Sequence, residues 1–581
     1  MAKMCQGGSF LWDAKAPESV FTPEDFSDEH RMIADTVSRF VSEKVLPEVE
    51  ELDCQKEGLM RDLLVEAGQL GLLGANIAEE HGGFDMDEIS STIIAERTGS
   101  TGSFCAAHGA QVGIGSLPIV YFGTERQKRK YLPPIVTGQR IAAYALTEPG
   151  SGSDALSAKS RAVLGADGRF FVLNGAKQFI TNAGLADIFI VYAKTEGDRL
   201  SAFIVEADSP GLSTGVEEKK MGILGSSTRS VYFDDVRVPA ENLLFEMGNG
   251  HLVAFNILNI GRHKISANAL GSARLALDLS SAYANERKQF GKPISTFGLI
   301  REKLARMAVS VYTMESVVYR TCGMLNDKLS GLDKSHPEGG RAAAEAIAEY
   351  AVECSIGKVF ATEAQGRVID EGVQIHGGYG FIREYAIERL YRDARIMRIF
   401  EGTNEINRTI IPATLLRRAK KKELPLFEAV SHIRGKASAL APRKTEDDLV
   451  QAAKDVFLFS LGVAFEKSGE ALVKCQEVLG RLADMAILAY AMESGLLRAR
   501  KAEAKGKNAP HKSAMARAFI YESIPEIETS ATEILAFCSS GAEQAQLLLI
   551  LKKLLQYVPV DLIGLREQIA ARITEAGKYV S

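Results

Sequence analysis

The chain has 581 residues, of which 46% are hydrophobic and 25% charged, a composition typical of an ordinary folded protein. Its formal net charge is -5 and its pI is near 6.1, so no overall basic field indicates a nucleic-acid partner. At roughly 100–200 residues per domain, this length predicts three or four folding units.

The cysteines and the N-terminal residues indicate a compartment. Seven cysteines are scattered along the chain, and none lies in a Cys-x-x-Cys pair, which is typical of free thiols in a reducing environment. Residues 1–15 contain no arginine and no long apolar run, so we expect no signal or transit peptide. No stretch approaches the roughly 20 apolar residues of a spanning helix. We therefore expect a cytoplasmic protein.

Residues 1–142 have mostly helical spacing. Thr22-Pro23-Glu24-Asp25 combines a capping residue, a proline and first-turn acids, and so predicts a helix start. Apolar residues then recur at helical spacing, at Met32, Ile33, Val37, Phe40, Val41 and Val45. We interpret residues 1–142 as an N-terminal helical domain.

Residues 143–250 change to β-strand character. Short runs of β-branched and aromatic residues are separated by Gly, Asn, Asp and Pro, which is typical of strands and turns. These runs occupy residues 170–173, 188–192, 202–205 and 230–233. They predict a small β-barrel or sheet domain.

Helical spacing resumes at residue 251. We predict a helical domain over 251–418 with a polar loop near 331–340, a linker over 419–445 and an additional helical domain over 446–581. The basic stretch 417–422 before the linker could equally be a solvated helix end. One buried stripe of the last domain is predicted at Leu482, Met485, Ala489, Met492 and Leu496. The fold class is therefore α+β.

Several common chemistries have no motif in this chain. The histidines show no metal-ligand spacing such as HExxH, so we expect no metal site. The GxSxG elbow of hydrolases and the GxxxxGK[ST] phosphate loop are both absent. Gly378-Tyr379-Gly380 lacks the third glycine of a dinucleotide-binding fingerprint.

Three polar segments could bind a ligand. Residues 144–155 (YALTEPGSGSDA) offer hydroxyls and flexible backbone amides, which can bind a phosphate or the polar edge of a cofactor. Residues 177–184 (KQFITNAG) place an aromatic ring two positions before a hydroxyl, on one face of a strand. Residues 285–293 contain Arg287, whose guanidinium can pair with a phosphate. Each segment also has a structural explanation that fits the local sequence as well or better: a turn for the first, a core aromatic residue for the second and a solvated basic face for the third.

A fourth segment, residues 374–408, contains a carboxylate between apolar residues. Glu401 follows Ile399 and Phe400 and precedes Gly402. Desolvation raises the pKa of such a carboxylate, which suits a general base near neutral pH. Taken alone, a buried structural glutamate is nearly as good an interpretation.

Together the four segments resemble the acyl-CoA dehydrogenase family. The motifs TEPGSGSDA, ITNAG, ERKQFGK and RIFEGTNEI occur in the family's order over about residues 25–415. The length and the helical tail beyond residue 420 are similar to the very-long-chain subgroup, as are FGLIREKLARM at 297–307 and VAFNILNIGR at 253–262. The resemblance implies a four-helix bundle in the domain after the sheet.

The resemblance also implies the site. Glu401 occupies the position of the catalytic base. Some relatives carry the base instead at the position of Gly261, which has no side chain to serve. The implied substrate-binding residues are Ser153, Asn259, Arg262 and Gly402. Asn259 replaces an acid found in some relatives.

FAD is the implied cofactor. The residues at its binding positions are Tyr144, Leu146, Thr147, Ser153, Phe179, Thr181, Arg287, Phe290, Phe297, Gln374, Gly377, Gly378, Thr403 and Glu405. Relatives usually have tryptophan at the position of Phe179 and often glutamine at that of Glu405. By analogy Arg287 and Gln374 serve the FAD of a neighbouring subunit, so we expect a homodimer or homotetramer.

The implied reaction is the α,β-dehydrogenation of fatty acyl-CoA to trans-2-enoyl-CoA in fatty acid β-oxidation, with electrons passed to electron-transfer flavoprotein. Small residues at Ala106, Ala107, Gly109 and Ala110 would line the acyl tunnel by analogy and favour long chains, although close helix packing explains them equally well. The apolar and lysine residues of 547–555 favour packing of the tail, with peripheral membrane contact through the C-terminal domain as the alternative.

Three alternatives remain open. An acyl-CoA oxidase would let oxygen reoxidise the flavin, and the motifs match dehydrogenases more closely. A non-catalytic assembly or scaffold protein could keep the fold without turnover, against which the intact Glu401 and flavin motifs argue. A branched or aromatic acyl group could replace the straight chain.

Overall fold

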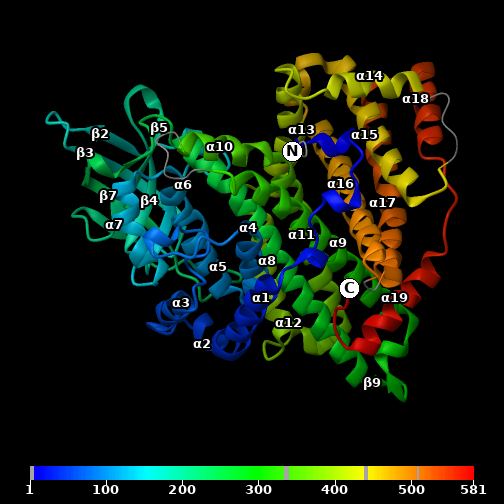
Figure 1. Cartoon of the computed structure of the whole chain (residues 1–581), viewed down its shortest axis with the longest axis horizontal. Helices are drawn as coiled ribbons and strands as arrows, with labels where there is room; N and C mark the ends of the chain where they lie inside the picture. The colour runs from blue at the N-terminus through cyan, green and yellow to red at the C-terminus, as the bar shows by residue number, and fades with distance from the viewer. Residues whose placement is uncertain (1–5, 333–338, 437–442, 507–508) are drawn as a thin grey trace.

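The computed structural model describes residues 6–332, 339–436, 443–506 and 509–581. Figure 1 shows a sheet on one side of the molecule, long helices through its middle and a second set of helices on the other side. The α+β class and the order of helical, β, helical and further helical parts are those predicted from the sequence.

The N-terminal part is helical. Its main helices are α1 (Asp28–Phe40), α3 (Leu59–Gln69), α4 (Glu88–Thr98), α5 (Ser103–Gly109), α6 (Leu117–Phe122) and α7 (Glu125–Val136). The helix start predicted at Thr22 is confirmed only for a short 3-10 helix, Pro23–Asp25, and not for the first α-helix. Thr22 and Asp25 close a short 3-10 turn as a capping box, and the extended ψ of Phe26 ends that turn. The first α-helix begins only after Ser27, whose side chain accepts a hydrogen bond from the His30 N–H.

Eight strands form the main sheet. They are β1 (Ala142–Ala145), β2 (Arg161–Leu164), β3 (Phe170–Thr181), β4 (Ile188–Lys194), β5 (Leu200–Glu206), β6 (Leu212–Thr214), β7 (Thr228–Pro239) and β8 (Leu243–Leu244). Their order is β6-β7-β3-β2-β4-β5-β8, and β1 pairs in parallel with β4. The four runs predicted as strands lie in β3, β4, β5 and β7. β4 and β5 are buried along almost their whole length, so both of their faces are covered.

Long helices follow the sheet. The bundle is built from α8 (Gly250–Glu286), α9 (Gly298–Leu329), α11 (Ala351–His376) and α13 (Asn404–Lys420), with α10 (Gly339–Glu349) and α12 (Ala386–Ala394) beside it. Gly357 of α11 faces Ser266 of α8, and further along both helices Gly372 faces Ser280, which shows that α8 and α11 run in the same direction. A Cβ at these glycines would lie 3.1 Å and 3.0 Å from the serine hydroxyls, so glycine permits the close approach. The loop predicted near 331–340 falls largely on residues 333–338, outside the described residues.

The additional helices are α14 (Leu426–Lys436), α15 (Glu446–Ser468), α16 (Gln476–Ala504), α17 (Ala509–Cys538), α18 (Gly541–Leu554) and α19 (Leu562–Ala576). The basic stretch 417–422 covers the end of α13, and α14 lies inside the segment predicted as a linker. The aromatic ring of Phe427 packs on Phe465 at 4.9 Å between centroids, which attaches α14 to α15. The predicted stripe of α16 is buried throughout. The domain boundaries stay a prediction.

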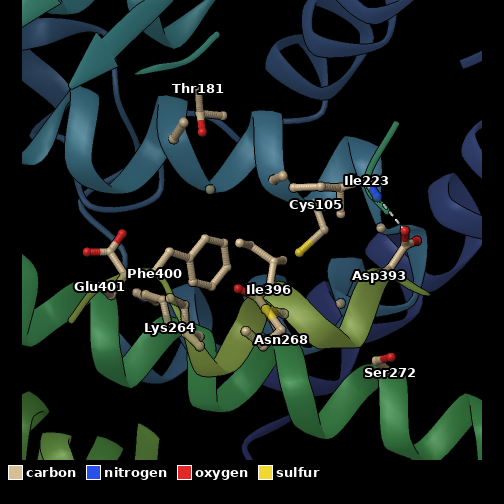
Figure 2. Close-up of a pocket in the computed structure, with 18 of the residues that line it drawn as sticks. Cys105, Thr181, Ile223, Lys264, Asn268, Ser272, Asp393, Ile396, Phe400 and Glu401 are labelled. Carbon is tan, nitrogen blue, oxygen red and sulfur yellow. Dashed lines mark hydrogen bonds between the residues drawn. The ribbon is translucent and has the colours of Figure 1, made fainter. Parts of the chain in front are cut away.

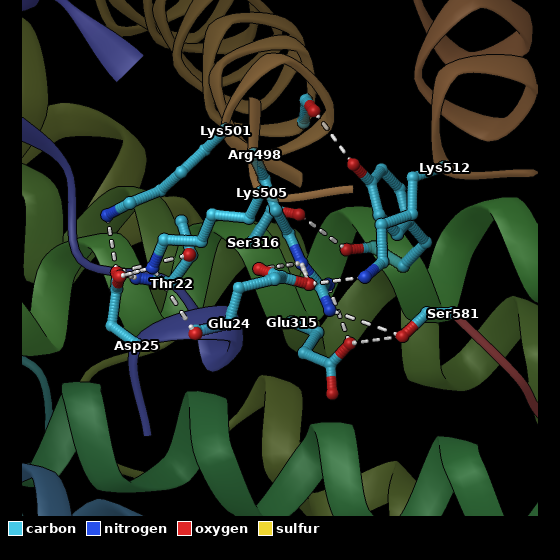
Figure 3. Close-up of polar contacts among 12 residues, drawn as sticks. Thr22, Glu24, Asp25, Glu315, Ser316, Arg498, Lys501, Lys505, Lys512 and Ser581 are labelled. Carbon is cyan, nitrogen blue, oxygen red and sulfur yellow. Dashed lines mark hydrogen bonds and ion pairs between the residues drawn. The ribbon is translucent and has the colours of Figure 1, made fainter. Parts of the chain in front are cut away.

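Buried ion pairs fasten the additional helices to the rest of the molecule (Figure 3). Arg498 of α16 reaches Glu24 at 3.0 Å and Glu315 of α9 at 2.6 Å, and all three side chains are buried. Lys512 of α17 adds a second cation to Glu24 at 2.7 Å. The Tyr579 hydroxyl, near the end of the chain, donates to Glu315. This cluster therefore joins segments from both ends of the sequence.

The leucines of α18 are partly buried and partly exposed. In α18, Leu551 and Leu554 are buried, whereas Leu549 is exposed. None of the helices within the described ranges combines the length and apolarity that crossing a bilayer requires. Peripheral membrane contact stays a prediction.

Candidate functional site

A cavity lies between two walls (Figure 2). One wall is α5 together with the π-helical turn Ala110–Gly115 that follows it, and the other is α8. Segment 396–401 closes a third side through Ile396, Met397 and Phe400. Glu401 lies at one end, and Ser272 and Asp393 lie toward the other. The small residues at 106–110 predicted a cavity along this helix, whereas residues 396–400 carried no such signal.

The backbone at Glu401 adopts an uncommon conformation. Glu401 has φ of 55° and Gly402 has φ of 81°, so the chain makes a left-handed turn just before α13. Such a turn at a non-glycine residue costs about 1–3 kcal/mol unless its surroundings hold it. Three side chains do so. Arg262 donates to the Glu401 carbonyl at 3.2 Å, while Asn407 at 2.8 Å and Lys358 at 2.9 Å donate to the Gly402 carbonyl.

The environment of the Glu401 carboxyl raises its pKa. Burial raises the pKa to about 7, and the nearby Arg262 and Lys358 cations oppose that rise. Its apolar neighbours in the sequence predict the same direction. A Cβ at Gly261 would lie 3.4 Å from the Glu401 carboxyl carbon. Glycine at this position therefore leaves free the space directly in front of the carboxylate.

Arg262 and Asn259 lie behind this turn rather than along the cavity wall. Both are buried, and Arg262 donates to the Asn259 side-chain oxygen at 2.6 Å. Neither residue is among those that line the cavity. In this arrangement Asn259 orients the guanidinium that holds the Glu401 carbonyl. A direct contact of either residue with substrate stays a prediction.

Lys358 of α11 is a residue that sequence reasoning missed. Its side chain is fully buried, and its ammonium donates to the Gly402 carbonyl and to the Asn404 side-chain oxygen, the latter at 2.7 Å. Burial lowers the Lys358 pKa to about 7, and the Glu401 charge opposes that fall. The available signal was a lysine between apolar neighbours in a helix, since such lysines are rarely buried without a partner.

The two β-domain motifs meet at the edge of the cavity. The Gln178 N–H donates to the Thr147 carbonyl at 2.9 Å, which joins the two segments. Thr181 lines the cavity. A β-bulge between Lys177 and Ile180 gives Phe179 a φ of 59° and leaves its side chain 59% exposed. Tyr144 and Leu146 are buried beside this edge, and Ser153 is exposed.

Asn182 is a second residue that sequence reasoning missed, although it stands in the quoted ITNAG motif. It is buried with φ of 66°, and its amide donates to the Ala107 carbonyl at 3.0 Å. Its side-chain oxygen has no hydrogen-bond partner among the described residues. Asn182 therefore ties the bulged strand to α5.

Another predicted group lies apart from the cavity, where α8 and α11 end. The Arg287 guanidinium lies 5.4 Å from the Tyr379 ring centroid, and the Phe290 and Phe297 rings lie 6.0 Å apart. Phe290 is 94% exposed, Gln374 is exposed, and a Cβ at Gly377 or Gly378 would meet nothing. The structure brings these residues to one exposed face but not to Glu401.

Thr403 and Glu405 begin α13 directly after the Glu401 turn. The Thr403 hydroxyl caps the helix by accepting the Ile406 N–H at 3.3 Å. Glu405 is exposed, and hydrogen bonds from its own backbone N–H and from Thr403 lower its pKa. The acid at this position is therefore charged at neutral pH and lies at a helix N-terminus that favours it.

The small residues of α5 and of the π-helical turn after it divide into two sets. Ala106, Gly109 and Ala110 line the cavity, as expected by analogy. Ala107 instead packs in the core of the N-terminal helices. A Cβ at Gly109 or Gly113 would have no heavy atom within 4 Å, so these positions open the cavity wall.

One group of possible metal ligands lies away from the cavity. Within the described residues, Glu80, His81 and Glu125 bring ligand atoms within 4.8 Å of one another. Lys128 already pairs with Glu125 at 2.9 Å. This arrangement is that of an ion-pair cluster.

Known proteins match this chain along almost its whole length. Family models described as acyl-CoA dehydrogenase N-terminal, middle and C-terminal domains match residues 27–139, 143–236 and 248–416. The chain belongs to the acyl-CoA dehydrogenase family. A further acyl-CoA dehydrogenase C-terminal model matches residues 452–553.

Among similar acyl-CoA dehydrogenases, a probable acyl-CoA dehydrogenase of Bacillus subtilis is 49% identical over 100% of this chain and 99% of its own length. The human very long-chain specific acyl-CoA dehydrogenase is 35% identical over 86% of this chain and 78% of its own. A crystal structure of acyl-CoA dehydrogenase complexed with FAD from Bacillus anthracis, 50% identical, superposes with a TM-score of 0.97 over 99% of this chain and 100% of that one.

Proposed function

We propose that this acyl-CoA dehydrogenase uses FAD to convert long-chain fatty acyl-CoA to the trans-2-enoyl-CoA, with Glu401 as the base. The observation that carries the proposal is a carboxylate with a pKa of about 7 at one end of an apolar cavity, with free space in front of it at Gly261. A base with that pKa is half ionised at neutral pH, which suits proton abstraction.

The residues present fit FAD. Phe179 offers an exposed ring beside Thr181 at the cavity edge, and the Asn182 side-chain oxygen has no protein partner among the described residues. The open backbone at Gly377 and Gly378 allows close approach of a phosphate or a ring. The residues that would hold FAD are Tyr144, Leu146, Thr147, Ser153, Phe179, Thr181, Arg287, Phe290, Phe297, Gln374, Gly377, Gly378, Thr403 and Glu405. Bound FAD supplies the acceptor for the hydride from the substrate β-carbon.

The chain's own residues perform the proton transfer. The Glu401 carboxylate removes the α-proton, while its backbone N–H hydrogen-bonds the thioester oxygen and so acidifies that proton. Arg262 and Lys358 hold the turn that aims the carboxylate, through the carbonyls of Glu401 and Gly402. The apolar wall at Phe400 and Ile396 excludes water from the base.

The cavity wall supports long chains. Ala106, Gly109, Ala110 and Gly113 leave the acyl path open along α5 and the π-helical turn after it. The subgroup named in the human relative is very long-chain specific, which agrees with this geometry.

Two partners are part of the proposal. The exposed face of Arg287, Phe290 and Gln374 supports a homodimer or homotetramer in which each subunit completes its neighbour's cofactor site. Electron-transfer flavoprotein is proposed as the acceptor of the electrons in fatty acid β-oxidation. Light scattering of the purified holoenzyme tests the oligomeric state. Turnover with electron-transfer flavoprotein in the absence of an artificial dye tests the electron acceptor.

The test of the central proposal is anaerobic titration of the purified flavoprotein with acyl-CoAs of increasing length, for the wild type and Glu401→Gln. Long chains should bleach the flavin of the wild type, and the variant should hold FAD without bleaching. A wild type that holds FAD and is bleached by no acyl-CoA would support the scaffold alternative. Rapid reoxidation of the reduced enzyme by oxygen, with hydrogen peroxide formed, would support the oxidase.

A further inference from the structure

The far end of the cavity carries polar side chains that the proposed reaction does not use. Ser272 of α8 and Gln365 of α11 both line the cavity, and both are buried. Because α8 and α11 run in the same direction, with Ser266 beside Gly357 and Ser280 beside Gly372, residues 272 and 365 lie at nearly the same level. Both side chains therefore border the same stretch of the cavity.

This stretch lies deep in the acyl path. Gly261 faces Glu401, and Ser272 lies 11 positions further along α8, which is roughly 16 Å at the helical rise per residue. Figure 2 shows Ser272 and Asp393 away from Glu401, with Ile396 between them. A group bound there belongs to the distal part of a long acyl chain, not to the thioester.

Gln365 is the residue that points to a ligand. It is 1% exposed, and its side-chain oxygen has no hydrogen-bond partner among the described residues. A chain made only of methylene groups would leave this buried acceptor unpaired, which costs binding free energy. A donor on the acyl chain would satisfy it.

We propose that the cavity selects acyl-CoA substrates that carry a hydroxyl group near the far end of the chain, bound by Gln365 and Ser272. The substrate hydroxyl donates to the Gln365 side-chain oxygen and accepts from the Ser272 hydroxyl. This inference names the substrate class of the proposed dehydrogenase and so rests on that function.

Charge excludes a distal carboxylate. Asp393 lines the same end of the cavity, where it accepts the Ile223 N–H and lies 3.4 Å from Arg389. The lysine of the cavity wall, Lys264, is already paired with Glu88 at 3.2 Å. A second anion beside Asp393 would meet repulsion without a free cation among these residues, whereas a neutral hydroxyl meets none.

The experiment compares matched substrates. The wild-type holoenzyme is mixed anaerobically with a series of saturated acyl-CoAs and with the same series carrying a hydroxyl on the last carbon. For each substrate, the rate constant of flavin bleaching is divided by the half-saturating substrate concentration. At the length that places the hydroxyl beside Gln365, we expect a preference of about tenfold for the hydroxylated chain. Gln365→Met keeps the side-chain length but removes the acceptor, so the preference should disappear as the unsubstituted chain improves.

Ser280→Ala is the control, because Ser280 is a buried α8 serine that donates to the Ala276 carbonyl outside the cavity. It should keep the wild-type preference. If both series bleach the wild type equally at every length, or if Gln365→Met keeps the preference, the hydroxyl site is overturned while the dehydrogenase stands. If neither series bleaches the wild type, the proposed function itself has failed. The wild-type comparison decides the question even if the variant does not fold.

Discussion

Lys358 affects Glu401 in two ways, through charge and through position. Its ammonium opposes the burial that raises the Glu401 pKa, and it donates to the carbonyl of the very next residue, Gly402. Other charged or titratable groups near the pair are Arg262 of α8, Tyr144 of β1, and Glu363 and Glu405 beside Lys358. The base therefore sits among groups from four elements.

Lys358→Met should move the acid limb of the pH–rate profile upward. Without this cation, only Arg262 opposes the effect of burial on Glu401, so the Glu401 pKa rises above about 7 and less of the base is ionised at neutral pH. A shift of one pKa unit lowers the rate about tenfold on the acid side. Stopped-flow flavin reduction across pH measures this limb. Lys358→Arg keeps the positive charge, so the acid limb should return to its wild-type pH. The maximal rate should recover less, because arginine does not reproduce the lysine's position. A uniform loss of rate with an unmoved limb would mean that Lys358 acts through structure alone.

At the scale of elements, the helical segment that contains α5 and the π-helical turn sets the room for the acyl chain. Gly109 and Gly113 open the wall because a Cβ there would meet no atom within 4 Å. Ala107, two positions before Gly109, faces the N-terminal core instead. Side-chain size on one face of this segment therefore decides how far a chain can extend.

Gly109→Val should shorten the longest chain that the enzyme accepts. Gly109 has ordinary helical dihedrals, so valine fits the backbone and projects into the cavity. We expect kcat/KM for long chains to fall at least about tenfold, while shorter chains keep most of theirs. Chain-length profiles of flavin reduction measure this effect. An unchanged profile would show that the acyl chain passes elsewhere.

Element types were more predictable than contacts between elements. The runs at 188–192 and 202–205 became β4 and β5 because β-branched and aromatic residues between turn formers leave few alternatives. The start predicted at Thr22 opens only a 3-10 turn, which Phe26 ends, and no local propensity distinguishes such a turn from the first turn of an α-helix. Glu401 was singled out through a family motif and its apolar neighbours, and its role stays a prediction. Lys358 was missed because its partners, Gly402 and Asn404, lie 44 and 46 residues further along the chain. Gln365 was missed because only the packing of the helices places it on the cavity wall.

At the scale of the whole molecule, the additional helices are joined to the body by buried charge as well as by apolar packing. Arg274 and Arg498 approach Glu315 from α8 and α16, and they hold its pKa down to about 2 against burial. Because the Glu315 pKa is lowered by folding, its contribution to stability is present above the unfolded value of 4.5 and is lost as pH falls toward about 2. The cluster is therefore fully formed at neutral pH.

Arg498→Met should destabilise the fold by about 3–5 kcal/mol at neutral pH, because Glu24 and Glu315 would keep buried charges with fewer partners. Urea unfolding measures this loss, with Arg572→Met as the control, since its pair with Glu575 is exposed and contributes little. The loss should shrink in acid, where both carboxylates become protonated in the variant. Adding Glu315→Gln to Arg498→Met should restore part of the stability, because it removes the charge left behind. If the single variant were as stable as the control, apolar packing alone would attach the additional helices to the dehydrogenase body.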